Sequence, residues 1–292
     1  MASLALVIKS LGEISLEKLK ELIKRHLSLL KSSSSYVDVI VTNRITDSER
    51  LDHVLGNLYS SIREVLMTEN LYETPINVLF NQKDTWLRNH VWDMLLVSTD
   101  VSIADAYKYK KLQNVDLTGR TTIISGETLS TKENEDADLY SVSALGGTFD
   151  HLHDGHKILL SIAAFLTSQR LIVGVADQEL LNNKKFAKYL ESFEVRARNV
   201  EEFVARVKPS LRLEIVALRD VCGPTGAVPE IQSLIVSRET EAGGKTVNAV
   251  RKEKGLSALV IHVVNVLGGR EEDNWKEKLS STELRKRKTI ES

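Results

Sequence analysis

The sequence predicts an α/β fold in which parallel sheets are flanked by helices, and three observations lead to this fold class. Short apolar runs alternate with longer helical patterns along the 292 residues. A polar stretch at residues 130–138, rich in Lys, Glu, Asp and Asn, interrupts the alternation once, and the alternation then resumes over a second half of similar size. Strands that alternate with helices favour parallel pairing through crossover connections. The interruption predicts two domains, residues 1–138 and 139–292.

The first half contains five apolar runs of strand length. They occupy residues 4–8, 37–41, 76–80, 94–98 and 121–124. Helical patterns at residues 16–30 and 49–67 separate the first three runs. We therefore expect an N-terminal α/β domain, to which the sequence assigns no role.

The second half repeats this order of elements. Strands are expected at residues 140–145, 171–175, 213–217, 234–237 and 259–266. Helices are expected at residues 156–167, 193–207, 245–253 and 281–288. The sequence thus predicts a second parallel sheet, formed independently of the first.

The composition is typical of a soluble globular protein, with 42% hydrophobic and 27% charged residues. No run of about 18 apolar residues is present and the N-terminus lacks a secretory signal pattern, so we expect no membrane span and no export. The single cysteine, Cys222, cannot form an internal disulfide, which favours the cytoplasm. The net charge of −1 argues against a broad nucleic-acid surface.

The most informative stretch, residues 146–156, reads Gly-Gly-Thr-Phe-Asp-His-Leu-His-Asp-Gly-His. It joins a predicted strand to a predicted helix. A helix start attracts anions because unpaired N–H groups and the positive end of the helix dipole point to the same place. Two glycines let the backbone approach a ligand closely, and His153 and His156 supply further donors. The pattern indicates a site for the phosphates of a nucleotide.

Two other interpretations of this stretch stay open. It can be a surface loop that happens to be rich in histidine, or a metal site built from His151, His153 and Asp154 or His156. A structural zinc needs three or four converging ligands, and a lone cysteine without a second histidine cluster does not favour one. The glycine spacing also fits the dinucleotide-binding fingerprint poorly.

Residues 234–255 form a second strand, polar loop and helix. Gly244-Lys245-Thr246 imitates the end of a P-loop, but Glu239 stands where that motif requires glycine, so we reject a P-loop. The loop places Arg238 at the carboxyl end of a strand, where ligands of open α/β sheets bind. A solvated loop before a capped helix is the alternative.

Two more groups of side chains suit phosphate binding. Lys184 and Lys185 follow the strand at 171–175, from which a lysine can reach a phosphate as a point charge. Hydroxyls at residues 280–282 begin a helix, and Arg285 follows one turn later. A capped, solvated helix or a disordered basic tail would also explain this last segment.

Two of these stretches resemble motifs of the nucleotidyltransferase superfamily. Its Gly-Thr-Phe-Asp and His-x-Gly-His pattern is matched by residues 147–156. Its Ile-Ser-Ser-Thr-x-x-Arg pattern is matched by residues 279–285, with Leu in place of Ile. Within that superfamily the chain is similar to the eukaryotic, fungal-type phosphopantetheine adenylyltransferases, on residues 174–177, 183–185, 193–200, 236–240, 243–244 and 248–251. The resemblance implies two Rossmann-like domains, of which the C-terminal one has the nucleotidyltransferase fold.

The resemblance also implies transfer of AMP from ATP to 4′-phosphopantetheine in coenzyme A biosynthesis. Mg²⁺ would be carried by the triphosphate, with no metal site built from the protein. ATP would contact Gly147, Thr148, Phe149, His153, His156, Ser280, Ser281, Thr282 and Arg285. The acceptor would contact Thr148, Lys184, Lys185, Arg238 and Arg251, and the catalytic residues would be His153, His156 and Lys185.

Several alternatives remain at this point. Cytidylyltransferases that act on phosphorylated alcohols share the first motif, but usually carry Arg-Thr-Glu-Gly where residues 275–278 read Trp-Lys-Glu-Lys. A tRNA synthetase fragment would need a basic surface, and a scaffold for other coenzyme A pathway enzymes would need no chemistry at all. The arginine-rich loop of bacterial relatives is replaced by Val-Ser-Arg-Glu-Thr, which leaves Arg238, Lys245 and Arg251 as candidates for the acceptor phosphate.

Overall fold

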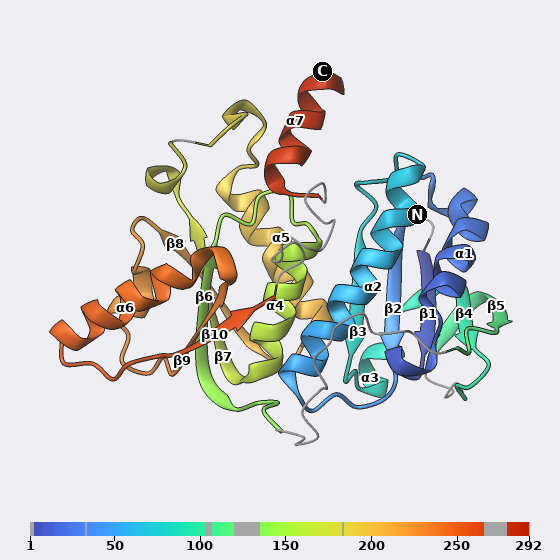
Figure 1. The fold of residues 1–292 in the computed structure, drawn as a ribbon, viewed down its shortest axis with the longest axis horizontal. Helices are drawn as coiled ribbons and strands as arrows, with labels where there is room; N and C mark the ends of the chain where they lie inside the picture. Colours follow the sequence, from blue (N-terminus) through green and yellow to red (C-terminus); the bar gives the residue numbers. More distant parts are fainter. Residues whose placement is uncertain are drawn as a thin grey trace. The chain divides into compact units, whose positions relative to one another are not determined.

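The structure is a computed structural model that describes residues 3–32, 34–102, 107–119, 135–182, 184–265 and 279–291. The chain divides into two compact units, Met1–Glu135 and Asp136–Ser292, where the sequence predicted a boundary at residue 138. Each unit contains one parallel sheet with helices beside it (Figure 1). The predicted α/β fold class is therefore confirmed.

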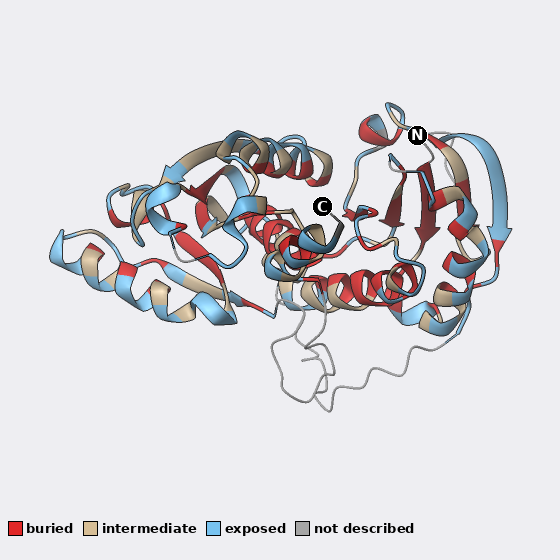
Figure 2. Cartoon of the chain, turned by 90° about the horizontal axis from the view of Figure 1, so that it is seen from above, coloured by how far each residue is buried: buried red, intermediate tan, exposed pale blue. Residues whose placement is uncertain are grey.

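The N-terminal unit holds a five-stranded parallel sheet in the order β3-β2-β1-β4-β5. Its elements are β1 (Ser3–Ile8), α1 (Leu16–His26), β2 (Tyr36–Val41), α2 (Ser48–Thr68), β3 (Ile76–Phe80), α3 (Asp84–Leu87), β4 (Val91–Ser98) and β5 (Lys108–Val115). The central strands are buried, whereas the helices turn one buried face inward and one exposed face outward (Figure 2). This burial explains why the strands are continuous apolar runs in the sequence, whereas apolar residues recur with helical period in the helices.

The first two helices begin at side chains that cap them. Ser15 Oγ accepts a hydrogen bond from Lys18 N at the start of α1 (3.4 Å). Asp47 Oδ1 accepts one from Arg50 N at the start of α2 (2.6 Å). Short polar side chains favour this position because they satisfy N–H groups that the helix itself leaves without partners.

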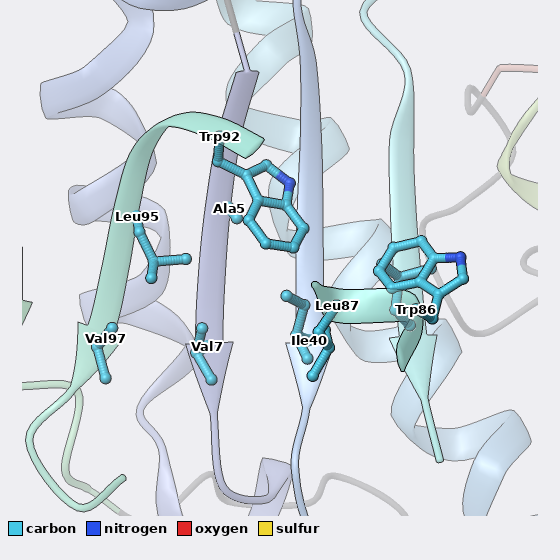
Figure 3. Packing of buried hydrophobic residues seen from close by; sticks show 9 residues of the cluster. Ala5, Val7, Ile40, Trp86, Leu87, Trp92, Leu95 and Val97 are labelled. Carbon is cyan, nitrogen blue, oxygen red and sulfur yellow. The ribbon is translucent and has the colours of Figure 1, made fainter. Parts of the chain in front are cut away.

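One cluster of the core packs apolar side chains of β1, β2 and β4 against α3 (Figure 3). It contains Ala5, Val7, Ile40, Leu79, Trp86, Leu87, Trp92, Leu95 and Val97. The indole Nε1 of Trp92 donates to the buried Asp38 Oδ2 (2.9 Å), and Asn77 Nδ2 donates to Asp38 Oδ1 (2.9 Å). Both oxygens of the fully buried Asp38 carboxylate thus accept hydrogen bonds, as burial requires.

The second unit also holds a five-stranded parallel sheet, in the order β10-β9-β6-β7-β8. Its elements are β6 (Tyr140–Gly147), α4 (Asp154–Leu166), β7 (Thr167–Ala176), α5 (Phe193–Val207), β8 (Arg212–Leu218), β9 (Ser233–Ser237), α6 (Glu241–Glu253), β10 (Val260–Val264) and α7 (Ser281–Glu291). In both units the first strand lies at the centre, the next two follow on one side and the last two on the other. Ligands of such sheets bind at the carboxyl ends of the strands where the order reverses, which in the second unit is between β6 and β9.

Most predicted elements are confirmed, and the exceptions have physical reasons. Strand β5 escapes the sequence prediction because it is exposed at every residue except Val115 and therefore has no apolar run. Helix α6 begins at Glu241, before the predicted start at 245, since Gly243 and Gly244 lie inside the helix. Thr167, predicted to end α4, instead begins β7. The predicted strand at 121–124 lies outside the described residues. No helix in the described part of the chain is long and apolar enough to cross a membrane.

Candidate active site at the carboxyl edge of the second sheet

The turn between β6 and α4 forms the centre of the candidate site. After Gly147 the chain passes through two residues with positive φ, Phe149 (52°) and His151 (45°), before α4 begins. The Phe149 side chain is 0% exposed and packs under the turn. A Cβ at Gly147 would lie 3.1 Å from the Phe149 ring, a closer approach than such contacts usually have, so glycine gives the ring room at this position. The Gly-Thr-Phe-Asp sequence therefore shapes the backbone that leads into the helix.

His153 and His156 lie together at the start of α4. Their rings stack with centroids 3.9 Å apart and an interplanar angle of 27°, and the His156 ring is 5.3 Å from that of Phe149. Burial lowers the pKa of His156 well below its usual 6.5, and the positive charges of His153 and Lys184 lower it further. The residue as a whole is half-buried, and its Nδ1 atom is buried without a hydrogen-bond partner among the described residues. His156 is thus neutral at pH 7 and can donate a hydrogen bond from one ring nitrogen.

The loop after β7 approaches the same turn. His151 N donates to Glu191 Oε2 (2.6 Å), and the His151 ring contacts Tyr189 O through Nε2 (2.9 Å). Lys184 and Lys185 lie in this loop and are exposed. The charge of Lys184 is one of the causes that lower the pKa of His156, so the ammonium group lies within electrostatic range of the imidazole.

Helix α7 begins beside the turn as well (Figure 1). Ser281 Oγ donates to Asp150 O (2.8 Å), and Ser280 Oγ accepts from Glu283 N (3.2 Å) as the cap of the helix. Arg285 is 2% exposed, donates to the carboxylate of Asp150 and also donates from Nε to Lys185 O (2.9 Å). The predicted late motif is therefore joined to the first motif by hydrogen bonds.

Arg196 is a residue of the site that the sequence reasoning missed. It is 2% exposed on α5 and donates to the carbonyl groups of Thr148 (2.8 Å), Ala176 (2.9 Å) and Glu191 (3.1 Å). Desolvation lowers its pKa, while nearby carboxylates, Asp150 first, oppose this. Arg196 thereby ties the turn after β6 to the end of β7. The sequence does hold an indication of this burial, because Arg196 lies on the same face of α5 as the apolar residues 200, 203, 204 and 207.

The two arginines predicted for the acceptor lie at opposite ends of the sheet. Arg238 directly follows β9 and donates from Nε to Asn265 Oδ1 (2.6 Å), so it lies at the carboxyl edge. Arg251 instead donates to Ser257 O (2.6 Å), Thr225 O (2.7 Å) and Val228 O (3.0 Å), which lie in segments that precede β10 and β9. Helix α6 runs back along the sheet at about 1.5 Å per residue, and this carries Arg251 away from the edge.

The described residues contain no group of three or more His, Cys, Asp or Glu side chains arranged to hold a metal ion. Asp150, which directly precedes His151, accepts a hydrogen bond from Glu191 N (2.8 Å) and one from Arg285. Its oxygens are therefore already engaged.

Comparison with known proteins decides the family. Residues 144–287 match the family described as Cytidylyltransferase-like. Phosphopantetheine adenylyltransferase of Saccharomyces cerevisiae is 45% identical over 269 residues, which cover 92% of this chain and 88% of the yeast chain. The chain belongs to the phosphopantetheine adenylyltransferase family. The predicted superfamily, fold class and nucleotidyltransferase activity are thereby confirmed.

Other members of the phosphopantetheine adenylyltransferase family are shorter. The phosphopantetheine adenylyltransferase of Methanopyrus kandleri is 38% identical over 141 residues, covering 48% of this chain and 86% of its own. Among solved structures, a protein of unknown function from Archaeoglobus fulgidus aligns with 45% of this chain and 94% of its own, at 31% identity and a TM-score of 0.40.

Proposed function

We propose that this protein transfers AMP from ATP to 4′-phosphopantetheine, giving dephospho-coenzyme A and pyrophosphate in coenzyme A biosynthesis. The observation that carries the proposal is the convergence of the turn after β6, the loop after β7 and the start of α7 on Asp150. Those segments hold the histidines, lysines and hydroxyls that the sequence assigns to phosphate binding. The likeness to the yeast enzyme over nearly the whole chain supports the choice of substrates.

The reaction needs positioning and charge stabilisation more than proton transfer. The phosphate of the acceptor is already largely ionised at neutral pH and attacks the α-phosphorus of ATP in line, while pyrophosphate leaves from the opposite side. No general base is required. Two negatively charged molecules must be held close together, so the protein contributes by orienting them and by opposing the charge that develops.

We assign the histidines and lysines different parts of this work. His156 has a lowered pKa and is neutral, so it donates a hydrogen bond to the triphosphate, with His153 stacked beside it. Positive charge comes instead from Lys184 and Lys185, in the loop that is hydrogen-bonded to the histidine turn through His151. An ammonium group suits two phosphates because its three donors rotate freely.

The remaining contacts are assigned by position. Gly147 and Thr148 lie at the end of β6, where the backbone and the threonine hydroxyl approach the reacting phosphates. Residues 280–282 would hold the leaving pyrophosphate, because the start of α7 adds N–H groups and the positive end of its dipole. Arg238 at the carboxyl edge is the favoured contact for the acceptor, whereas the bonds of Arg251 lie at the other end of the sheet.

Enzymes that transfer nucleotidyl groups from ATP generally use a divalent metal, and we propose Mg²⁺. The residues present fit an ion that is held by phosphate oxygens and water, since Asp150 is already bonded and the described residues gather no carboxylate cage. When bound, the ion would neutralise part of the triphosphate charge.

We place the reaction in the second unit and the protein in the cytoplasm. The phosphopantetheine adenylyltransferase of Methanopyrus kandleri aligns with 48% of this chain over 86% of its own length, so that relative is too short to hold two such units. The single cysteine, Cys222, is free and suits a reducing compartment.

Pyrophosphate release tests the function directly. The full chain is incubated with Mg²⁺, ATP and 4′-phosphopantetheine, in parallel with CTP and phosphocholine. We expect release only with the first pair, and dephospho-coenzyme A as the second product. Release with CTP and phosphocholine alone would establish the cytidylyltransferase alternative, and release with neither pair would refute the proposal.

A further inference from the structure

The buried ion pair of Asp150 and Arg285 is the feature of the second unit that the phosphate contacts do not use. Asp150 is 0% exposed and Arg285 2% exposed, and Arg285 Nη1 donates to Asp150 Oδ2 across 135 residues of sequence. A buried pair gains little net stability, because removing both charges from water offsets their attraction. Its presence therefore points to a role in fixing a conformation.

The other polar atoms of the pair bind two further segments, the loop after β7 and the start of α7. Asp150 Oδ1 accepts from Glu191 N (2.8 Å), and Asp150 O accepts from Ser281 Oγ (2.8 Å). Arg285 Nε donates to Lys185 O (2.9 Å), and Nη2 donates to Thr282 Oγ1 (3.3 Å). The turn after β6, the loop after β7 and the start of α7 are thus held by one hydrogen-bonded pair.

Each of these segments carries residues assigned to phosphate, namely the histidines of α4, the two lysines and the hydroxyls of α7. Arg285 itself is enclosed, and its Nε, Nη1 and Nη2 atoms all donate to protein oxygens. At 2% exposure the guanidinium has little surface open to a phosphate, and moving it away from Asp150 would leave an uncompensated buried carboxylate, which is costly.

We propose that Asp150 and Arg285 are positioning residues that set the three phosphate-binding segments in register, and that Arg285 does not contact the pyrophosphate. This inference rests on the proposed function of the same site. Removing either partner should displace lysines, histidines and hydroxyls together. A displacement of about 1 Å at such groups is enough to lower turnover about a hundredfold.

The test compares Asp150→Asn, Arg285→Met and the double variant. We expect each single change to lower kcat at least about tenfold and to raise KM for ATP and for 4′-phosphopantetheine together. The double variant should be no slower than the slower single variant, because both residues act as one unit. Direct contact of Arg285 with pyrophosphate predicts another result. Asp150→Asn would then keep kcat within twofold of the wild type, and the loss of kcat in the double variant would be the product of the losses in the two single variants. That result would overturn the proposal.

Two further variants separate positioning from general loss of stability. Arg63→Met removes another buried guanidinium, 4% exposed and bonded to Tyr72 O (2.6 Å) in the N-terminal unit. It should lower the melting temperature and leave kcat unchanged. Arg285→Lys keeps the charge but cannot bridge all three segments, so it should lose kcat even where Arg285→Met fails to fold. A wild-type kcat for Arg285→Lys would overturn the proposal.

Calorimetry with a non-hydrolysable ATP analogue keeps this test independent of the acceptor. It measures the triphosphate contacts without any transfer of AMP. Weaker analogue binding by Asp150→Asn and Arg285→Met, with Arg63→Met unchanged, would support positioning even if the acceptor proved to be another phosphate ester. Unchanged analogue binding in both variants would count against it.

Discussion

Replacement of His156 by alanine tests the chemistry proposed for the first turn of α4. The imidazole is neutral at pH 7 because burial, His153 and Lys184 all lower its pKa, so it acts as a hydrogen-bond donor. Loss of one donor that is preorganised for a transition state costs about 10²–10³ in kcat, or about 3–4 kcal/mol. We therefore expect His156→Ala to reduce kcat by about a hundredfold or more.

The fold of this variant should persist. The change removes ring contacts with His153 and Phe149, and a ring pair contributes only about 0.5–1.5 kcal/mol beyond the area it buries. Pyrophosphate release at saturating substrates gives kcat, and circular dichroism gives the melting temperature. His90→Ala is the matched control, since His90 stacks on Trp86 in the N-terminal unit with centroids 3.7 Å apart. A folded His156→Ala enzyme with kcat within threefold of wild type would refute the assigned role.

Three further predictions follow from the same geometry. Lys184→Met removes a charge that lowers the pKa of His156, so NMR titration should show the His156 pKa nearer 6.5, and an unchanged pKa would mean that the two groups do not face each other. Because the folded state binds a proton at His156 only well below pH 6.5, the free energy of unfolding should fall as pH drops below about 6.5, by at most about 1.4 kcal/mol per pH unit for this group. Urea titrations at pH 5.5 and 7.5 should show that the free energy of unfolding falls less in His156→Gln than in the wild type. Part of the fall should remain in this variant, because the pKa values of His53 and His262 are lowered as well. Gly147→Ala places a Cβ 3.1 Å from the Phe149 ring and should lower the free energy of unfolding in urea by about 1–3 kcal/mol. Gly243→Ala lies inside α6, where the new Cβ meets nothing within 4 Å, and should raise that free energy by up to about 1 kcal/mol. Equal effects at the two positions would contradict the packing argument.

The parts of the site that could be predicted are those encoded locally. The histidine turn occupies residues 146–156, where strand end, glycines and helix start are consecutive. The strands that carry it are apolar runs, because parallel strands are buried on both faces. Strand β5 shows the limit of this signal, since an exposed edge strand such as Lys108–Val115 has no apolar pattern to detect.

The parts that could not be predicted depend on distant residues. Arg285 and Asp150 are 135 residues apart, and Arg196 and Thr148 are 48 apart, so no spacing in the sequence reports their contact. An arginine in a motif is ambiguous for the same reason, because its side chain suits a phosphate or a carboxylate equally well. Only the fold shows that Arg285 faces Asp150. The sequence could name the residues of the late motif but not the partner of each.

The two units have the same strand order, so topology alone does not explain why the proposed chemistry belongs to the second. The helix starts differ in a relevant way. In the first unit, the side chains of Ser15 and Asp47 cap α1 and α2 and accept a hydrogen bond from an N–H group of the first turn.

Helix α4 begins differently, at His153, whose side chain makes no cap hydrogen bond to the described helix. A phosphate can then serve as the cap, with His156 one turn along as a second donor. The lysine nearest the end of β1, Lys9, pairs with Glu13 (3.3 Å), whereas Lys184 is within electrostatic range of a neutral imidazole. We therefore attribute the proposed phosphate binding to the residues at the helix starts. The sheet topology, which both units have, only places those residues at the carboxyl ends of the strands.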